Sequence, residues 1–481
     1  MKKCLTFLKN NLLMILLVLQ PFLDILSYVQ RGQSVSLAGY FRLAVTVLVP
    51  VYVLFFAKER KKFVISMAVI VGFCALHVLN GFRVGYISLF NDVKYLMLVC
   101  HSIIMVYSFM FLYEKDEIVR QIKTALKIIV ATTVITFYLS YILKSGSHTY
   151  IDTYIGWTGW NNTPSVFSII LSAQLPFAVY FCLESKTKWS LLFLVPVCYM
   201  YILNGTKAAY LTLLGTLLST AIFLIAEFFI QKKNKMPIIA IVALIVIAAG
   251  SIFAYNYSPR SDIDTLIGNS LQEGEQMLAD ADKQDKEDKE DKEDKEDKED
   301  KDKHQGDMVS QVVASYLDKD MIDRFGLDRI LEKYEGNFTA ESLANNRLRK
   351  IIYGSLVWDE TDALTKFVGF EQTKMYIGDG TYDLESDPQA IFFYYGYIGS
   401  LLMAGLLAYF WLRLIKQLIC KFKESFNLAN FIIFINYGLL MVSALYTGHL
   451  LRRPNSAIYL AVVLLLIYCR TEPLFKKRQK D

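Results

Sequence analysis

The sequence contains few cysteines and few histidines, the residues that most often form disulfides and bind metals. Among 481 residues there are seven Cys and five His. The cysteines all lie in apolar segments or their basic flanks, and none lies between Ser258 and Pro388, so no disulfide framework is expected. No spacing of His, Cys, Asp and Glu is typical of a metal site, although the acidic stretch at 380–387 could hold a divalent ion. We therefore expect no metal and no other cofactor.

Several common sequence motifs are also absent. There is no Walker loop, no dinucleotide-binding fingerprint and no nucleophile elbow. The chain also lacks the basic tract of a nucleic-acid binder, so no nucleic-acid partner is expected. Its function must therefore be inferred from its apolar segments and from the charges between them.

Apolar residues dominate the composition. They make up 54% of the chain, the mean hydropathy is +0.34, and there are 32 Phe and 30 Tyr. This composition excludes an ordinary soluble globular protein and predicts an all-α polytopic membrane protein. About twelve apolar stretches are suited to cross ~30 Å of hydrocarbon as helices. They lie near residues 11–29, 40–57, 63–80, 93–113, 127–143, 165–183, 189–204, 208–230, 238–255, 389–412, 428–447 and 456–469.

Basic residues mark one side of the predicted membrane protein. Lys and Arg concentrate in alternate loops of the twelve-helix arrangement, and the positive-inside rule places these loops and both termini in the cytoplasm. We expect the first apolar segment to remain as a signal anchor, because it is longer than a signal peptide and lacks a small-residue cleavage pattern. The basic clusters lie at residues 2–9, 58–62, 115–127, 186–188, 232–235, 413–423 and 470–480.

A long polar insert at 256–388 separates nine predicted membrane helices in 1–255 from three more in 389–481, which end in a basic cytoplasmic tail. By parity, the insert lies outside the cytoplasm. It contains 34 Asp and Glu against 18 Lys and Arg. A repeat of Asp, Lys and Glu at about 280–303 predicts a solvated spacer, either disordered or an isolated helix. The stretch 308–370 regains the spacing of amphipathic helices.

The segment NNRLRKIIYGSLVWDE at 345–360 predicts one of these helices. On a helical wheel it has one apolar face, with Arg349 on one flank and with Arg347 and Lys350 on the other. We expect the helix to lie on the membrane surface or to cap the helix bundle. Its cations either extend to the lipid interface as anchors or bind a ligand.

Ionisable residues within membrane helices, or at their ends on the side of the insert, are costly and are therefore candidates for function. Lys207 is the most informative, because it follows a short polar turn and has no acidic neighbour in sequence. Cations gathered at one rim suit an anionic lipid head group such as pyrophosphate, whereas each of them singly could be an interfacial anchor. The full set comprises Asp24, Arg42, Arg83, Asp92, Lys94, Lys207, Glu385, Asp387, His449, Arg452 and Arg453.

Three blocks of the sequence resemble a superfamily of bacterial integral membrane proteins, the O-antigen ligases and polysaccharide polymerases. NGTKAAYLTLLG resembles its small-residue turn before a cation, with Lys207 in the place usually taken by Arg. RKIIYGSLVWDETDALTKFVGFE resembles its pattern of an Arg, here Arg349, followed four residues later by an aromatic residue. ESDPQAIFFYYGYIGSLLMAGLLAYF resembles its return to the membrane, with Glu385 and Asp387 where many members have His and Asn.

The resemblance implies a fold like that of lipid-dependent glycosyltransferases and a location in the bacterial plasma membrane. It implies transfer of a glycan from an undecaprenyl-pyrophosphate carrier to a hydroxyl acceptor outside the cytoplasm, by a metal-independent inverting displacement. The product would be capsule, exopolysaccharide or another surface glycan, and other polysaccharide assembly proteins could be partners. The expected pyrophosphate ligands are Arg349, Lys207 and Arg347, and the expected catalytic residues are Glu385, Asp387 and His449.

Two other classes of function remain open. A flippase or transporter of lipid-linked oligosaccharide also commonly has about twelve helices and internal charges. It should show two related halves with broken helices, and the chain has no convincing repeat of this kind. A sensor or scaffold would explain the insert but not the cations. Within the enzyme class, the sequence leaves polymerase and ligase undecided, and it does not specify the sugar, the linkage or the acceptor.

Overall fold

The computed structural model describes residues 2–31, 36–290, 314, 316–336, 338–377 and 380–474. Helices make up most of this part of the chain, and loops connect them. The strands of this part, β1 (Tyr376–Ile377) and β2 (Gly380–Thr381), form one antiparallel pair. The predicted all-α fold is therefore confirmed. The charged spacer predicted at 280–303 begins within a helix that ends at Glu290, and the rest of it lies outside the described residues.

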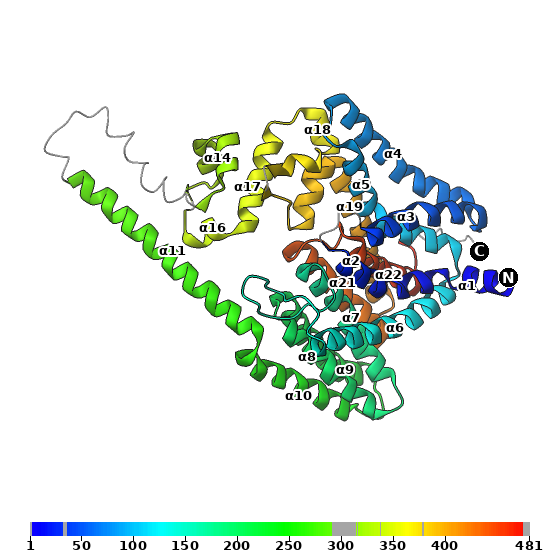
Figure 1. Cartoon of the computed structure of the whole chain (residues 1–481). Helices are drawn as coiled ribbons and strands as arrows, with labels where there is room; N and C mark the ends of the chain where they lie inside the picture. The colour runs from blue at the N-terminus through cyan, green and yellow to red at the C-terminus, as the bar shows by residue number, and fades with distance from the viewer. Residues whose placement is uncertain are drawn as a thin grey trace.

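The first half of the chain forms a bundle of long apolar helices (Figure 1). Each apolar stretch of the sequence becomes a helix, because a helix satisfies its backbone hydrogen bonds internally while its side chains face lipid. The helices are α1 (Lys2–Val18), α2 (Gln20–Val29), α3 (Leu37–Phe56), α4 (Arg60–Val84), α5 (Leu89–Leu112), α6 (Lys115–Ile142), α7 (Pro164–Glu184), η1 (Lys188–Phe193), α8 (Leu194–Asn204), α9 (Lys207–Ile230) and α10 (Ile238–Ala254).

The C-terminal part returns to the same bundle as α19 (Asp387–Cys420), α20 (Phe422–Ser425), α21 (Leu428–Tyr446) and α22 (Pro454–Arg470). By length and composition, 10 spans of the described chain could cross a membrane, with the kinked pair α1 and α2 counted as one span. Two further apolar helices, 188–204 and 454–470, are shorter. These spans and shorter helices match the twelve stretches of the sequence, and the polytopic membrane class is confirmed.

The bundle is apolar on its outside as well as in its core. Phe55, Phe82 and Ile222 are 65%, 71% and 67% exposed, which suits contact with lipid rather than with water. At the centre lies α22, in which every residue from Ser456 to Ile467 is buried. It packs against α5, α6, α7 and α21. Because protein surrounds it, this helix of 17 residues is shielded along its length.

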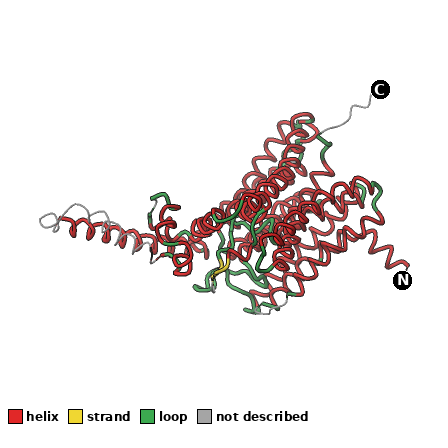
Figure 2. The backbone as a smooth tube through the Cα atoms, turned by 90° about the horizontal axis from the view of Figure 1, so that it is seen from above, coloured by secondary structure: helices red, strands yellow, loops and turns green. Residues whose placement is uncertain are grey.

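Between α10 and α19, the insert extends from one end of the bundle (Figures 1 and 2). α11 (Pro259–Glu290) leaves the bundle as one long helix, and Gly274 near its middle packs against Ala340. The other elements form a small lobe. They are η2 (Tyr255–Tyr257), α14 (Lys319–Phe325), α15 (Leu327–Lys333), α16 (Ala340–Ala344), α17 (Asn346–Asp359), α18 (Ala363–Val368), η3 (Gln372–Met375) and the β1–β2 pair.

The apolar side chains of the lobe pack around α17 and are continuous with the core of the bundle. Ile352, Tyr353 and Leu356 are buried, and the Tyr353 ring stacks on the Tyr382 ring with 4.1 Å between their centroids. The helix also packs against α19. This contact agrees with the expectation that the 345–360 helix caps the bundle, and the position of the helix relative to the membrane surface stays a prediction.

Hydrogen bonds and an ion pair connect the lobe to α4 and to the turn between α4 and α5. The buried carboxylate of Glu371 accepts hydrogen bonds from the backbone N–H groups of Ile87 (2.8 Å) and Ser88 (2.5 Å). Arg83 at the end of α4 forms an ion pair with Asp362 (2.8 Å). These contacts position the chain that leads into α19.

Candidate active site

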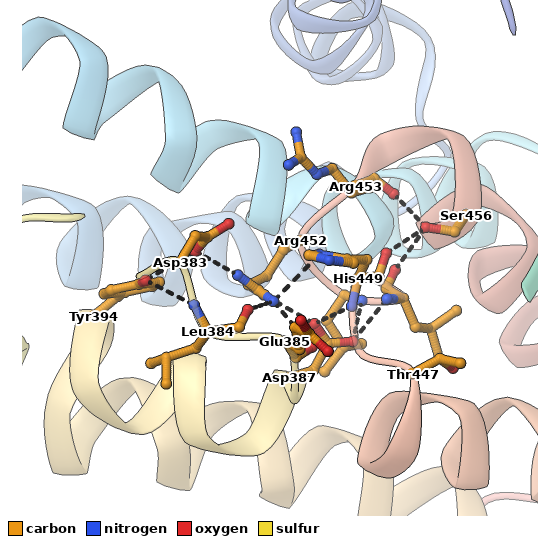
Figure 3. Close-up of polar contacts among 12 residues, drawn as sticks. Asp383, Leu384, Glu385, Asp387, Tyr394, Thr447, His449, Arg452, Arg453 and Ser456 are labelled. Atoms are coloured by element: carbon orange, nitrogen blue, oxygen red, sulfur yellow. Dashed lines mark hydrogen bonds and ion pairs between the residues drawn. The ribbon is translucent and has the colours of Figure 1, made fainter. Parts of the chain in front are cut away.

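Two loops that are far apart in sequence meet where the insert returns to the bundle (Figure 3). One is 383–387, which leads into α19, and the other is 447–453, which leads into α22; we call their contact the Asp387 junction. The Asp387 carboxylate at its centre is fully buried. It accepts four hydrogen bonds of 2.7–3.0 Å, three from the backbone N–H groups of residues 449–451 and one from Nε of Arg452. Because both oxygens are satisfied within the chain, Asp387 holds the loops together.

The two loops also touch through their backbones. At Gly448 the φ angle is +63°, and a Cβ placed there would lie 1.1 Å from the carbonyl oxygen of Glu385. Only glycine permits this approach. The next residue, His449, has a φ of 62°, a conformation that is costly for a side chain and is held here by its N–H bond to Asp387.

Arg452 is the buried cation of the junction. Its side chain has no exposed surface and forms ion pairs with Asp387 (3.0 Å) and Asp383 (2.9 Å). It also donates hydrogen bonds to the backbone carbonyl of Leu384 and to Nδ1 of His449 (3.3 Å). Because its positive charge is paired with two carboxylates and its donors are used within the chain, Arg452 organises the site.

Glu385 is the junction carboxylate that faces outward. Its side chain is 26% exposed, and its two oxygens accept hydrogen bonds from Nε of Arg347 (2.6 Å) and Nζ of Lys350 (3.0 Å). Burial raises its pKa, but the two cations lower it by more, so the pKa lies below its ordinary value of 4.5. Glu385 is therefore ionised at neutral pH and accessible from outside the junction.

His449 lies beside Arg452 and is neutral. Burial, followed by the charges of Arg452 and Arg453, lowers the pKa of its imidazole to about 3. Since an arginine can only donate, Nδ1 of His449 accepts from Arg452 and the ring proton resides on Nε2. The imidazole can therefore donate a hydrogen bond to a substrate oxygen.

Arg347 and Arg349 have different partners, as their opposite flanks on the helical wheel indicate. Arg347 contacts Glu385. Arg349 instead donates a hydrogen bond to the carbonyl oxygen of Leu343 (3.2 Å) and pairs with Asp318 (3.6 Å) within the lobe. The Nε of Arg349 is buried and has no hydrogen-bond partner in the described part of the chain.

Lys207 is exposed at the first position of α9, directly after Thr206, which caps that helix. Within the described ranges its side chain makes no hydrogen bond and no ion pair. The structure therefore joins four of the six predicted site residues through direct contacts at the junction, and it leaves Lys207 and Arg349 outside them. The four are Glu385, Asp387, His449 and Arg347.

The carboxylates of the acidic stretch at 380–387 pair with separate cations and do not converge on one point where an ion could bind. Asp383 and Asp387 pair with Arg452, and Glu385 pairs with Arg347 and its neighbour on α17. Among the residues that the structure describes, no group of three or more His, Cys, Asp or Glu side chains could hold a metal ion.

Sequence patterns alone do not single out Lys350, Asp383 and Arg452 for this site. Lys350 shares a flank of the helical wheel with Arg347, and Arg452 belongs to the set of ionisable residues at helix ends, so both carry a signal. Asp383 carries none, because its role depends on an ion pair with a residue 69 positions away.

A cavity of about 330 Å³ opens beside the junction. It lies between α2, α3 and α5, the residues just before α7, and the start of α22. Arg452 forms part of its wall, together with two further cations, Lys94 and Arg453. The junction and the cavity thus share one arginine.

No curated protein matches the chain. A model of the family described as O-antigen ligase like membrane protein matches residues 7–472, a range that includes the bundle, the lobe and both loops of the Asp387 junction. The chain therefore belongs to the O-antigen ligase-like membrane protein family, as a multi-pass membrane protein of the glycan ligase and polymerase type.

Proposed function

We propose that the protein transfers a glycan from an undecaprenyl-pyrophosphate carrier to a hydroxyl group of an acceptor, and so polymerises or ligates a surface glycan such as capsule or exopolysaccharide. The reaction takes place on the extracytoplasmic side of a bacterial plasma membrane, where the insert lies, and both termini are cytoplasmic. The observation that carries the proposal is the ionised, accessible Glu385 beside cations and a neutral imidazole.

In this reaction the acceptor oxygen attacks the anomeric carbon as the bond from that carbon to the pyrophosphate breaks. Glu385 takes the proton from the attacking hydroxyl as general base. His449 donates from Nε2 to a sugar oxygen, while Asp387 acts as a positioning residue because its four hydrogen bonds leave no free acceptor site. Charged side chains, and not a metal ion, stabilise the departing pyrophosphate. Because the acceptor displaces it in a single step, the configuration of the anomeric carbon is inverted.

Three cations are proposed to serve the pyrophosphate. Arg347 is nearest to Glu385 and can exchange part of its ion pair for a phosphate oxygen. Within the described residues, the only ion pair of Arg349 is a long one with Asp318 (3.6 Å), which a phosphate oxygen could replace. Lys207, which is exposed at the start of α9, would attract the head group. Neither Arg349 nor Lys207 contacts Glu385, so each would act on a part of the substrate that extends away from the base.

The carrier also needs a place for its hydrocarbon chain. A groove of about 530 Å³ runs between α4, α5 and α19, and Phe73, Val99 and Leu402 are among the apolar side chains that line it. α19 begins at Asp387 and lines the groove from its second turn onward. This continuity supports binding of the polyprenyl chain in the groove, with the head group near the junction.

The test is transfer by purified protein in lipid nanodiscs, with an undecaprenyl-pyrophosphate-linked oligosaccharide as substrate and the product length read on a gel. Glu385→Gln should lose the product and keep its thermal stability. Asp387→Asn should lose both, because an amide nitrogen cannot accept the hydrogen bonds of the junction. Glu341→Gln, an exposed glutamate of the lobe, is the matched control.

The same assay separates the proposal from a flippase. A flippase moves the lipid between leaflets and forms no new glycosidic bond. If the wild-type protein is a flippase, the substrate glycan will therefore keep its original length in the assay. Full activity in Glu385→Gln would instead exclude Glu385 as the general base.

A further inference from the structure

Two apolar grooves lie on two faces of α21, at the end of the bundle away from the Asp387 junction. The larger groove, of about 250 Å³, lies between α9, the last turns of α19, the start of α21 and the end of α22. The smaller groove, of about 140 Å³, lies between α6, α7, α21 and α22. Because α19 and α22 both begin near the junction and line the grooves at their far ends, the proposed transfer reaction uses neither groove.

One arginine belongs to both grooves. Arg470, the last residue of α22, lines the larger and the smaller groove, and so does Ile433 of α21. The two grooves therefore meet, and a cation lies at their meeting point. Arg470 is exposed, and within the part of the chain that the structure describes its side chain forms no hydrogen bond and no ion pair.

The other charges of the grooves cancel. Among the described residues that line the larger groove, Arg470 is the only charged one. In the smaller groove, Lys123 and Glu184 form an ion pair of 2.7 Å. The two grooves together therefore carry one net positive charge, located where they meet, and this charge suits a ligand with a single negative charge.

The larger groove also contains an unsatisfied acceptor. Oδ1 of Asn430 is buried and has no hydrogen-bond partner within the described ranges, while Nδ2 of the same side chain donates to the carbonyl oxygen of Ser425 (3.0 Å). A buried acceptor without a donor is costly, so a hydroxyl group of a ligand would be favoured there. The rest of the lining is mostly apolar. Leu418 and Phe434 are exposed on the outer side of the bundle, which suits contact with hydrocarbon chains.

We propose that the two grooves hold one anionic diacyl phospholipid with a hydroxyl-bearing head group, such as phosphatidylglycerol. Its phosphate binds Arg470, one acyl chain lies in each groove, and a head-group hydroxyl donates to Oδ1 of Asn430. Two hydrocarbon chains that diverge from one phosphate match two apolar grooves that diverge from one unpaired cation. The basic loops at this end of the bundle attract the same class of lipid. This phospholipid is distinct from the proposed glycan carrier, whose head group lies near the opposite ends of α19 and α22.

The test is a titration of the purified full chain in detergent, with bound lipid counted by native mass spectrometry. The probes are dioleoyl phosphatidylglycerol, dioleoyl phosphatidylcholine and the single-chain oleoyl lysophosphatidylglycerol, and the wild type should bind the first most tightly. Arg470→Gln should weaken the binding of dioleoyl phosphatidylglycerol roughly tenfold, because it removes a charge-assisted hydrogen bond to the phosphate. Arg470→Lys should retain most of the affinity. Lys61→Gln, which alters an exposed lysine at the start of α4 that lines neither groove, should bind as the wild type does.

A second variant tests the position of the acyl chains. Ala429 of α21 lines the smaller groove but not the larger one, so Ala429→Phe should fill the smaller groove and leave Arg470 unchanged. This variant should bind the dioleoyl and the single-chain phosphatidylglycerol with equal affinity, because the second chain has lost its groove. Melting temperatures measured without added lipid should be the same for all variants and the wild type.

Four results would overturn the inference. They are unchanged binding of dioleoyl phosphatidylglycerol by Arg470→Gln, equal binding of the two dioleoyl lipids by the wild type, and a retained preference for two chains in Ala429→Phe. The fourth is an equal loss of binding in Arg470→Gln and Lys61→Gln, which would identify general attraction to a basic surface. These measurements do not depend on glycan transfer, so they test this site independently of the proposed function.

Discussion

The charge of Glu385 depends on the two cations that it contacts. Because its folded pKa lies below 4.5, its ion pairs contribute stability that is complete above that pH and is lost as the pH falls through the folded value. Transfer that needs the carboxylate should therefore persist at about pH 5 and decline only in more acidic solution. Initial rates measured across this range check the expectation.

Lys350→Gln provides the comparison for this pH profile. Removing Lys350 removes the first of the cations that lower the pKa of Glu385, so the acidic decline should move to higher pH. Lys319→Gln, which alters an exposed lysine of the lobe, should leave the profile in place. A profile that stays unchanged in Lys350→Gln would mean that another group controls the acidic decline.

The two arginines of α17 should respond differently to truncation. Arg347→Ala should lower the transfer rate at least ~10-fold with little loss of stability, because its partner Glu385 stays exposed to water. Arg349→Ala should destabilise the lobe by roughly 1–3 kcal/mol through loss of its bond to the Leu343 carbonyl. Limited proteolysis of the lobe and transfer assays measure the two effects. If Arg349→Ala abolishes transfer in a lobe that resists protease normally, Arg349 is a direct ligand of the pyrophosphate.

At the scale of elements, the junction depends on how closely the loop before α22 approaches the start of α19. Gly448→Ala would place a methyl group on the Glu385 carbonyl at a positive φ, so the loop must move and the Asp387 bonds must break. We expect loss of transfer and a lower melting temperature. Gly438→Ala on the preceding helix α21 is the matched control, since nothing lies within 4 Å of its added carbon.

The control should be neutral or slightly stabilising, because alanine favours a helix over glycine by roughly 0.5–1 kcal/mol. A Gly448→Ala protein with wild-type transfer and melting temperature would show that the junction tolerates separation of its loops.

The sequence predicts these elements better than it predicts their junction. Apolar runs mark the membrane helices because lipid imposes the same requirement on each of them separately. The flanks of α17 are also predictable, since helical spacing alone sets Arg347 and Arg349 apart. By contrast, the roles of Asp383, Glu385 and Asp387 differ only through partners elsewhere in the chain. Nothing in the local sequence reveals that one of these three carboxylates is exposed and another accepts four hydrogen bonds.

At the scale of the whole molecule, the alternation of basic loops predicts which side of the membrane each end of the bundle occupies. A cysteine introduced by Ser270→Cys on the exposed surface of α11 should react with a membrane-impermeant thiol reagent in intact cells. Native Cys420, which is exposed at the far end of α19 from Asp387, and native Cys4 should react only after permeabilisation. Labelling of Cys420 in sealed cells, with position 270 protected, would reverse the proposed orientation and with it the proposed function.

The central position of α22 has a consequence for how the protein is made. This helix is synthesised after every helix that packs around it, so α5, α6, α7 and α21 enter the membrane before their common partner exists. The donors that satisfy Asp387 lie just ahead of α22 and emerge with it. The centre of the bundle and the candidate active site are therefore completed together, late in biosynthesis. A chain that ends before Pro454 would lack the helix that fills the centre of the bundle, together with the packing of α22 against α5, α6, α7 and α21.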